Sequence, residues 1–263
     1  MTNPHAAARE LEWVGSEYLL RWLGRMEDSE ITEFGAVRAI RTPGHPDVDF
    51  LNTVHRLLPE DAGLVPRIAA HYADAGIRPW LELMPAPGFG DLADALADAG
   101  GRHIGFHAMS ERDLPAPVPG ALPPGVTVEG VASDLEDFVR VLPAGHDVPA
   151  EHLEDAIRRT RECAGIAGAR LYLARVDRVP AAAAVLFLAP PVAYLASAST
   201  LALHRRRGCQ TALILHRLAD AAAAGCTRAA VITKWGSQSH VNVARAGFRG
   251  AYTKVVWRLG VGF

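Results

Sequence analysis

One stretch of the chain combines residue types that bind phosphate-like anions. Residues 205–211 read Arg-Arg-Arg-Gly-Cys-Gln-Thr, with an apolar run before them and a helical pattern after them. The first turn of a helix has backbone N–H groups without intrahelical partners and carries the positive end of the helix dipole. A glycine there lets an anion approach the backbone closely, and arginines add charge and paired donors. This arginine loop therefore predicts a cradle for a diphosphate or a similar anion.

The arginine loop matches neither of two common phosphate-binding motifs. A Rossmann site would need Gly-x-Gly-x-x-Gly and a P-loop would need Gly-Lys-Ser/Thr, and neither pattern occurs here. The three arginines are equally compatible with a solvent-exposed run in which Gly208 simply turns the chain. The seven residues alone do not separate a cradle from such a turn.

A regular series of elements surrounds the arginine loop. Continuous or alternating apolar runs predict strands, and a 3.6-residue period predicts helices. The predicted order is β-α-α-β-β-β-α-β-α-β, at residues 126–131, 133–142, 149–163, 171–176, 183–188, 192–203, 209–224, 229–233, 237–246 and 251–259. Asp177-Arg178 is predicted as the hairpin turn, and Gly225 as the C-cap of the long helix. The residues of that helix expected to face inward are Ala212, Leu215, Leu218, Ala219 and Ala222.

A proline-rich segment divides the chain. Five prolines lie within residues 111–125, a composition that favours an extended linker. We therefore expect one domain at residues 1–112, a linker at 113–125 and a second domain at 126–263. The first domain ends with a helix, a strand, a helix and a strand, at residues 61–75, 79–83, 90–99 and 103–109, in the order found at the C-terminus. This repeated order predicts an internal duplication with a degenerate N-terminal copy.

The bulk composition excludes several classes of protein. Lys and Arg number 27 against 29 Asp and Glu, and this balance argues against a nucleic-acid partner. Three cysteines match no metal or disulfide spacing, so we expect no metal and a reducing cytoplasmic setting. Residues 179–203 carry no charge, but Pro180, Pro190 and Pro191 interrupt them. That run is expected to form buried strands rather than a membrane span.

Several segments together carry a resemblance to a known family. Residues 200–214, 225–226, 237–248 and 251–254 closely resemble the GCN5-related N-acetyltransferase (GNAT) superfamily. Its two best markers are the Arg-x-x-Gly-x-(Gly/Ala) loop, here residues 205–210, and a closing Arg-x-Gly-Phe. The resemblance implies an α/β mixed sheet with the acyl-CoA N-acyltransferase fold. The N-terminal part would then be a degenerate GNAT-like domain in tandem with the second.

The resemblance also implies a site and an activity. Acetyl-CoA, as co-substrate, would place its pyrophosphate on the amides of residues 206–211 and its arm along a strand near Ser199. The residues so assigned to cofactor binding are Ser199, Thr200, Leu201, Arg205, Arg206, Arg207, Gly208, Cys209, Gln210, Thr211 and Asn242. The implied reaction transfers an acetyl or short acyl group to a primary amine, most simply that of a small molecule. A homodimer is a further expectation.

The chain departs from the family pattern where catalysis is concerned. Val243 replaces the tyrosine that many members carry four residues before the closing glycine. No Asp or Glu lies in residues 194–203, where a general base is often found. Tyr252, Ser239 and His240 are the candidate substitutes. The alternative function is therefore a CoA-binding regulatory or structural module whose catalytic residues have decayed.

The loop itself also departs from the pattern. Gln210 stands where the family has a small residue, and Cys209 lies at the start of a helix, a position that lowers thiol pKa values. A small space-filling role is expected for Cys209 rather than nucleophilic chemistry.

Overall fold

The computed structural model describes residues 4–115, 123–131 and 135–260, which form two compact units. The first unit combines Met1–Met109 with Ala251–Phe263, and the second is Ser110–Gly250. Most of the predicted linker, and the predicted start of the helix at residue 133, lie outside the described residues. The expected second domain ran to residue 263. In the structure its last strand, β12 (Arg249–Arg258), pairs instead with β4 (Trp80–Leu83), because strand membership follows hydrogen-bond partners.

The first unit contains a mixed sheet in the order β1-β2-β3-β4-β12-β5. Its elements in chain order are α1 (Pro4–Leu23), β1 (Glu30–Phe34), β2 (Val37–Arg41), η1 (Asp49–Leu51), β3 (Thr53–His55), η2 (Pro59–Leu64), α2 (Val65–Ala73), β4, α3 (Phe89–Asp98), β5 (Arg102–Asp113) and β12. β3 and β4 run parallel, whereas β4 and β12 run antiparallel. Strand β5 leaves this unit after Met109.

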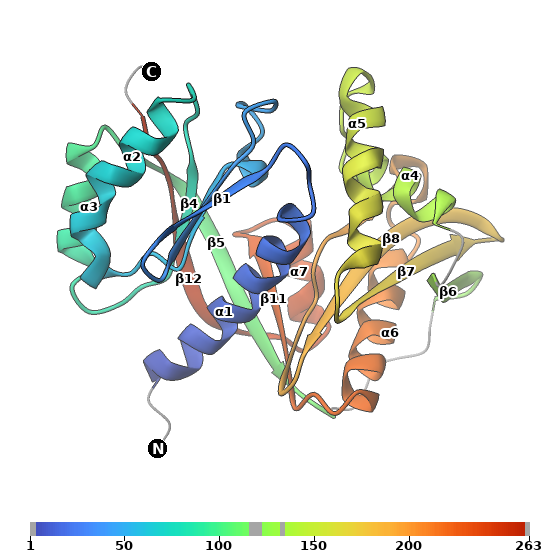
Figure 1. The fold of residues 1–263 in the computed structure, drawn as a ribbon. Coiled ribbons are helices and arrows are strands. Elements are labelled where there is room, and N and C mark those ends of the chain that lie inside the picture. Colours follow the sequence, from blue (N-terminus) through green and yellow to red (C-terminus); the bar gives the residue numbers. More distant parts are fainter. Residues whose placement is uncertain (1–3, 116–122, 132–134, 261–263) are drawn as a thin grey trace. The chain divides into compact units, whose positions relative to one another are not determined.

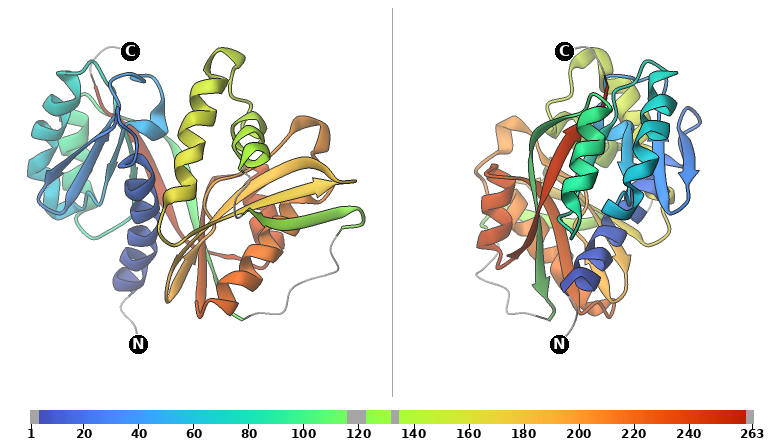
Figure 2. Two further views of the ribbon diagram at one scale, coloured as in Figure 1. Left: turned by 45° about the vertical axis from the view of Figure 1, so that its right-hand side comes forward. Right: turned by 90° about the vertical axis from the view of Figure 1, so that its left-hand side faces the viewer.

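The two faces of this sheet differ in polarity. On one face, Leu81 and Leu83 of β4 belong to a buried core with residues of α2 and α3. On the other face, Trp80 and Glu82 alternate with them, as strand geometry requires. Figures 1 and 2 show α2 and α3 on the first side of the strands and α1 on the second. Helix α1 therefore lies against a polar sheet face.

The second unit contains a sheet in the order β5-β11-β9-β8-β7-β6, and β10 pairs with β8 off this path. Its elements after β5 are β6 (Val126–Val131), α4 (Glu136–Gly145), α5 (Ala150–Arg161), η3 (Glu162–Gly165), β7 (Ala169–Val176), β8 (Val179–Ala189), β9 (Val192–Tyr194), β10 (Ala198–Thr200), η4 (Ala202–His204), α6 (Cys209–Ala223), β11 (Arg228–Lys234) and α7 (Gln238–Arg245). The predicted order of helices and strands is confirmed, with one strand split in two.

Local signals account for much of the second unit. Asp177 and Arg178 both have positive φ, as expected for a two-residue hairpin turn between β7 and β8. Gly225, at φ 83°, follows the end of α6. Within α6, Ala212 and Leu218 are buried as predicted. The prediction for Ala219 was wrong, because that residue is exposed.

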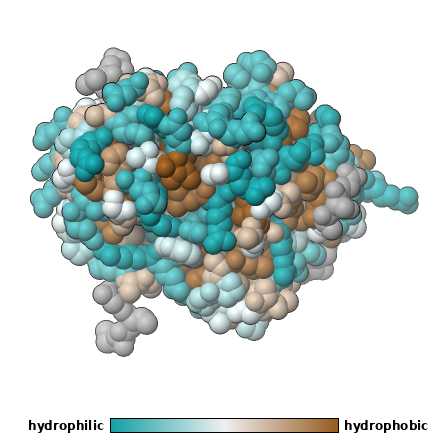
Figure 3. Space-filling model, viewed as in Figure 1, coloured by the Kyte–Doolittle hydropathy of each residue, from teal (hydrophilic) through white to brown (hydrophobic). Residues whose placement is uncertain are grey.

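The uncharged run of residues 179–203 can be compared with the expectation of buried strands. No helix in the described ranges is both long and apolar enough to cross a bilayer. The uncharged residues 179–203 form strands and a short 3-10 helix instead. On the face seen in Figure 3, apolar surface is broken into separate patches among hydrophilic residues.

Candidate functional site

The strand predicted before the arginine loop is interrupted by residues 195–197. The two pieces, β9 and β10, both pair antiparallel with β8. Tyr194 lies opposite Phe187, whereas Ala198 lies opposite Ala184. Three residues therefore face two on β8, which constitutes a β-bulge. The single long strand predicted from the apolar run was wrong, because a bulge is decided by the partner strand.

The bulge separates β10 from β11. Before it, β9 pairs parallel with β11, and Leu195 N donates to Ala230 O at 2.8 Å. After it, β10 pairs with β8, and Leu201 N donates to Ala181 O at 3.0 Å. Within the described sheet no strand is paired to the other edge of β10. An edge of this kind can hydrogen-bond an extended ligand arm.

The arginine loop leads directly into helix α6. Gly208 is the N-cap at φ 85°, a left-handed conformation in which a Cβ would also overlap Pro123. The first backbone bond of the helix runs from Ala212 N to Gly208 O at 3.0 Å. The amides of residues 209–211 therefore have no intrahelical acceptor. The structure thus confirms the predicted helix start, and free amides of this kind can bind an anion.

The three arginines of the loop differ in their partners. Arg205 donates to both carboxylate oxygens of Asp147, at 2.8 and 2.6 Å. Arg207 donates to Asp177 at 3.1 Å. Arg206 is exposed and has a positive φ of 65°. Both aspartates are themselves exposed, so these pairs orient the arginines without burying them.

The strand residues assigned to cofactor binding have buried side chains. Ser199 Oγ donates to Leu142 O at 2.8 Å, and Thr200 Oγ1 accepts from Gln210 Nε2 at 3.0 Å. Leu201 is partly buried. Because these side chains are committed inside the unit, any contact with a ligand arm would come from the backbone of β10. Gln210 thus ties the helix start to the strand.

Cys209 is buried at the start of α6, and Thr211 beside it is exposed. Burial raises the pKa of the Cys209 thiol, although the neighbouring Arg207 acts in the opposite direction. The expectation of a lowered thiol pKa was therefore wrong. A small buried thiol of this kind fills space, as expected.

Helix α7 brings Ser239, His240 and Asn242 into one short segment. His240 Nδ1 accepts from Gly236 N at 3.0 Å, so the neutral ring carries its proton on Nε2. The centroid of the His240 ring lies 4.9 Å from the centroid of the Trp235 ring. Asn242 Oδ1 accepts from Gln238 Nε2 at 2.9 Å, and Ser239 is exposed.

Tyr252 belongs to the first unit, whereas Ser239 and His240 belong to the second. Its hydroxyl donates to Glu12 Oε2 of helix α1 at 3.0 Å. Since a carboxylate accepts this proton, the hydroxyl is not free to protonate a leaving group. The structure thus does not bring the three catalytic candidates together within one unit.

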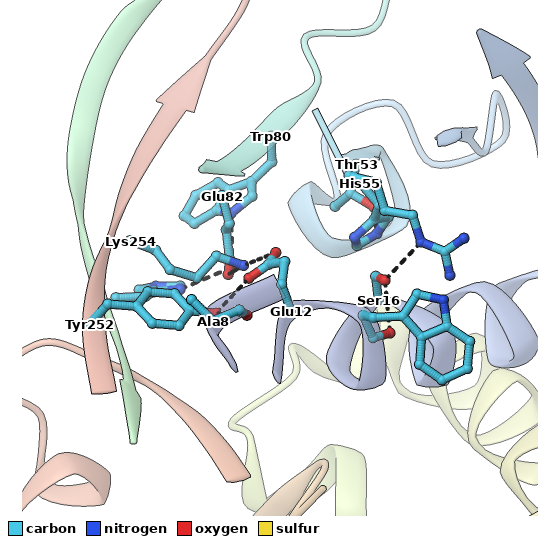
Figure 4. Close-up of polar contacts among 12 residues, drawn as sticks. Ala8, Glu12, Ser16, Thr53, His55, Trp80, Glu82, Tyr252 and Lys254 are labelled. Carbon is cyan, nitrogen blue, oxygen red and sulfur yellow. Dashed lines mark hydrogen bonds and ion pairs between the residues drawn. The ribbon is translucent and has the colours of Figure 1, made fainter. Parts of the chain in front are cut away.

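Tyr252 belongs to a charged network on the polar face of the first sheet (Figure 4). Lys254 Nζ lies 2.6 Å from Glu12 Oε1 and 3.4 Å from Glu82 Oε2. Glu82 also accepts from His107 and from the Trp80 indole. Burial would raise the pKa of Glu82, but Lys254 and the His107 hydrogen bond outweigh it and lower the value to about 2. Glu82 therefore stays ionised.

Sequence reasoning missed several residues that shape these regions. Asp147 and Asp177 are turn residues with no motif, and each meets its arginine only after folding. Arg217 is an arginine inside an apolar helix pattern and was not expected to be buried. Its spacing of four residues from Leu213 and from Ala221 places it on the apolar side of the helix, and that spacing was the available sequence signal. Among the described residues, no three His, Cys, Asp or Glu side chains gather as a metal site.

Solved structures resemble this chain over nearly its whole length. No family model matches the sequence, and no curated protein matches it. A GCN5-related N-acetyltransferase from Kribbella flavida aligns over 96% of this chain and 95% of its own, with TM-score 0.68 and 20% identity. The fold is that of the GNAT acyltransferases. The predicted α/β fold class is thereby confirmed.

Two further GNAT structures support this assignment. A tandem GNAT protein from the clavulanic acid biosynthesis pathway covers 94% of this chain and 97% of its own, with TM-score 0.64 and 16% identity. A GNAT protein from Sphaerobacter thermophilus covers 88% and 84%, with TM-score 0.63 and 14% identity. The match to a tandem GNAT over nearly the whole chain is consistent with two GNAT-like units.

Proposed function

We propose that the second unit binds acetyl-CoA and transfers its acetyl group to the primary amine of a small molecule. The observation that carries the proposal is a bulged strand that leaves β11 immediately before an arginine-flanked helix start. Such an arrangement offers an open strand edge and an anion cradle within a few residues of each other. The GNAT fold of the chain supports the same assignment.

The donor set of the second unit fits the cofactor. The amides of residues 209–211 and the side chain of Arg206 would hold the pyrophosphate, because all of them offer N–H groups and positive charge. Arg205 and Arg207 would add donors by exchanging their aspartate partners for phosphate oxygens. The backbone of residues 199–201 would pair with the pantetheine arm, and Asn242 would lie near that arm.

Acetyl-CoA would supply an activated acetyl group: a neutral amine would form the C–N bond as the C–S bond breaks, and the proton lost by the amine would balance the released CoA thiolate as free thiol. The protein positions the amine, and a backbone N–H near the bulge would stabilise negative charge developing on the carbonyl oxygen. Among the catalytic candidates, His240 is the best oriented, because Gly236 N fixes its Nε2–H as a donor. Ser239 is a second donor on the same helix.

One observation favours the alternative, a CoA-binding module without catalysis. Val243, at the position where many GNAT members have a catalytic tyrosine, is packed in the hydrophobic core of the second unit. No hydroxyl can therefore act from that position.

Two measurements test the proposal. Isothermal titration calorimetry with CoA tests binding, and release of free thiol from acetyl-CoA with a panel of primary amines tests transfer. We expect binding together with thiol release that depends on the amine. Binding without release on any amine would favour the non-catalytic module, and no CoA binding would overturn both functions.

A further inference from the structure

Arg217 is a buried cation in the hydrophobic half of α6. Its side chain is 2% exposed, and its neighbours Leu213, Leu218 and Ala221 on the same helix are also buried. Burial lowers the pKa of Arg217 to about 10, which still leaves the guanidinium charged at neutral pH. Taking a charge out of water costs several kcal/mol, so a buried arginine needs compensating partners.

The partners of Arg217 are three backbone carbonyls. Nε donates to Leu213 O at 3.1 Å within the helix. Nη1 donates to Val185 O and to Ala196 O, both at 3.0 Å. These last two carbonyls belong to β8 and to the segment between β9 and β10. The guanidinium thus joins the two strands at one point.

That point is the β-bulge itself. Val185 is one of the two β8 residues that face residues 195–197 across the bulge. Its N–H donates to Ser197 O at 2.9 Å, so its carbonyl and that of Ala196 are the acceptors that Arg217 satisfies. A bulge leaves ladder groups unpaired, and an unpaired buried carbonyl is costly. Arg217 removes that cost at the residue where the strand changes direction.

We propose that Arg217 is a positioning residue that holds the bulge and so keeps β10 apart from β11 for the cofactor arm. This inference rests on the proposed function of the second unit. Arg217 acts through the backbone of residues 195–201 and touches neither the cofactor nor the acceptor amine. An aliphatic side chain would fill the same volume of the core, but it could not hydrogen-bond the carbonyls of two strands.

The test compares Arg217→Met and Arg217→Lys with Leu218→Ala. Methionine keeps most of the side-chain length and donates no hydrogen bond. Lysine keeps the charge but ends in a single nitrogen, so it cannot replace both the Nε bond to Leu213 O and the Nη1 bonds to the two strand carbonyls. Leu218→Ala removes core packing one residue further along α6 and leaves the hydrogen bonds of Arg217 to the bulge carbonyls in place. CoA affinity is measured by calorimetry and stability by thermal unfolding.

We expect Arg217→Met to weaken CoA binding about tenfold, which corresponds to about 1.4 kcal/mol, because buried carbonyls at the bulge lose their hydrogen-bond donor. Arg217→Lys should weaken it less. Leu218→Ala should leave CoA affinity within about twofold of wild type even if it lowers the unfolding temperature as much. A purely structural arginine would show no such difference between variants of equal stability.

Hydrogen exchange supplies a second readout. In Arg217→Lys, amides of residues 195–201 should exchange faster than in wild type, whereas in Leu218→Ala they should not. If Arg217→Met does not fold, Arg217→Lys decides the question. Wild-type CoA affinity in the folded variants would overturn the role of Arg217 and leave the proposed function intact. Failure of the wild-type protein to bind CoA would overturn both.

Discussion

In each half of the sequence a helix precedes a strand, a helix and a strand, but the first helices of these two series, α2 and α6, start differently. In the second unit, three arginines and Gly208 precede α6, and its first turn has no acidic residue. In the first unit, α2 continues directly from the 3-10 helix η2, which starts after Leu58 with Glu60 and Asp61, and Asp61 Oδ2 accepts from Leu58 N at 3.1 Å. The fold supplies a helix start in both units, and the residues beside it decide whether a foreign anion can bind there.

The ion pairs of the two units also differ in burial. On the polar face of the first sheet, Lys254 pairs with both Glu12 and Glu82 below the surface. In the arginine loop, Arg205 and Arg207 pair with exposed aspartates that a phosphate can replace. Buried pairs are costly to break, whereas exposed pairs contribute little. The charges of the first unit are thus committed to one another, whereas the proposed function requires that the exposed arginines of the second unit be available to a ligand.

The largest effect should come from Lys254→Met. This change leaves Glu12 and Glu82 buried without their cation, so the free energy of unfolding should fall by about 3–5 kcal/mol. Urea unfolding measures it. The matched control is Arg9→Met, which breaks the exposed Arg9–Glu60 pair and should cost less than about 1 kcal/mol. Equal losses for the two variants would remove the contrast between buried and exposed ion pairs.

A pH effect should come from His55 in the same unit. Burial and, less strongly, Lys254 lower the pKa of His55 from its usual 6.5 to about 4, while Glu82 acts in the opposite direction and Arg56 adds to the lowering. Between these values the unfolded chain binds a proton that the folded chain does not, so stability falls as pH drops. From pH 7 to about 4.5 this group should cost about 2 kcal/mol of stability.

His55→Gln should remove that part of the pH dependence, measured as urea unfolding at both pH values. His103, on β5 of the same unit, is exposed, and His103→Gln should keep the full dependence. If both variants retain it, the loss of stability arises elsewhere.

The next effect concerns ligand binding. Arg206→Glu reverses an exposed charge in the arginine loop, so the Kd for CoA should rise about tenfold. Arg67→Glu, an exposed arginine on α2 of the first unit, should change it by less than about twofold. Calorimetry should also show one CoA per chain. A stoichiometry of two would mean that the acidic helix start of the first unit binds CoA as well.

The smallest effect should come from Asp147→Asn. This change frees Arg205 from its bidentate partner, and CoA should then bind about twofold tighter, in line with the small worth of exposed pairs. The same titration measures it, with Glu151→Gln on α5 as an exposed control. Weaker binding would show instead that Asp147 holds Arg205 in place for the ligand.

Much of the second unit was predictable because its signals are local. The positive-φ turn at Asp177-Arg178 and the glycine after α6 follow from backbone preferences of a few residues. In the first unit, α1 and β1–β3 were not predicted. Helix α1 faces a polar sheet surface and places Glu12 and Tyr18 on its inner side, so it lacks a clean apolar stripe.

The sequence by itself determined the arginine loop, the helix start at Gly208 and the order of elements around them. Each depends on residues adjacent in the chain, whose conformational preferences act without the rest of the fold. Tertiary structure alone decided the bulge at residues 195–197, the burial of Arg217 and the transfer of β12 to the first unit. These depend on hydrogen bonds and ion pairs between residues far apart in the chain, which only the assembled strands bring together.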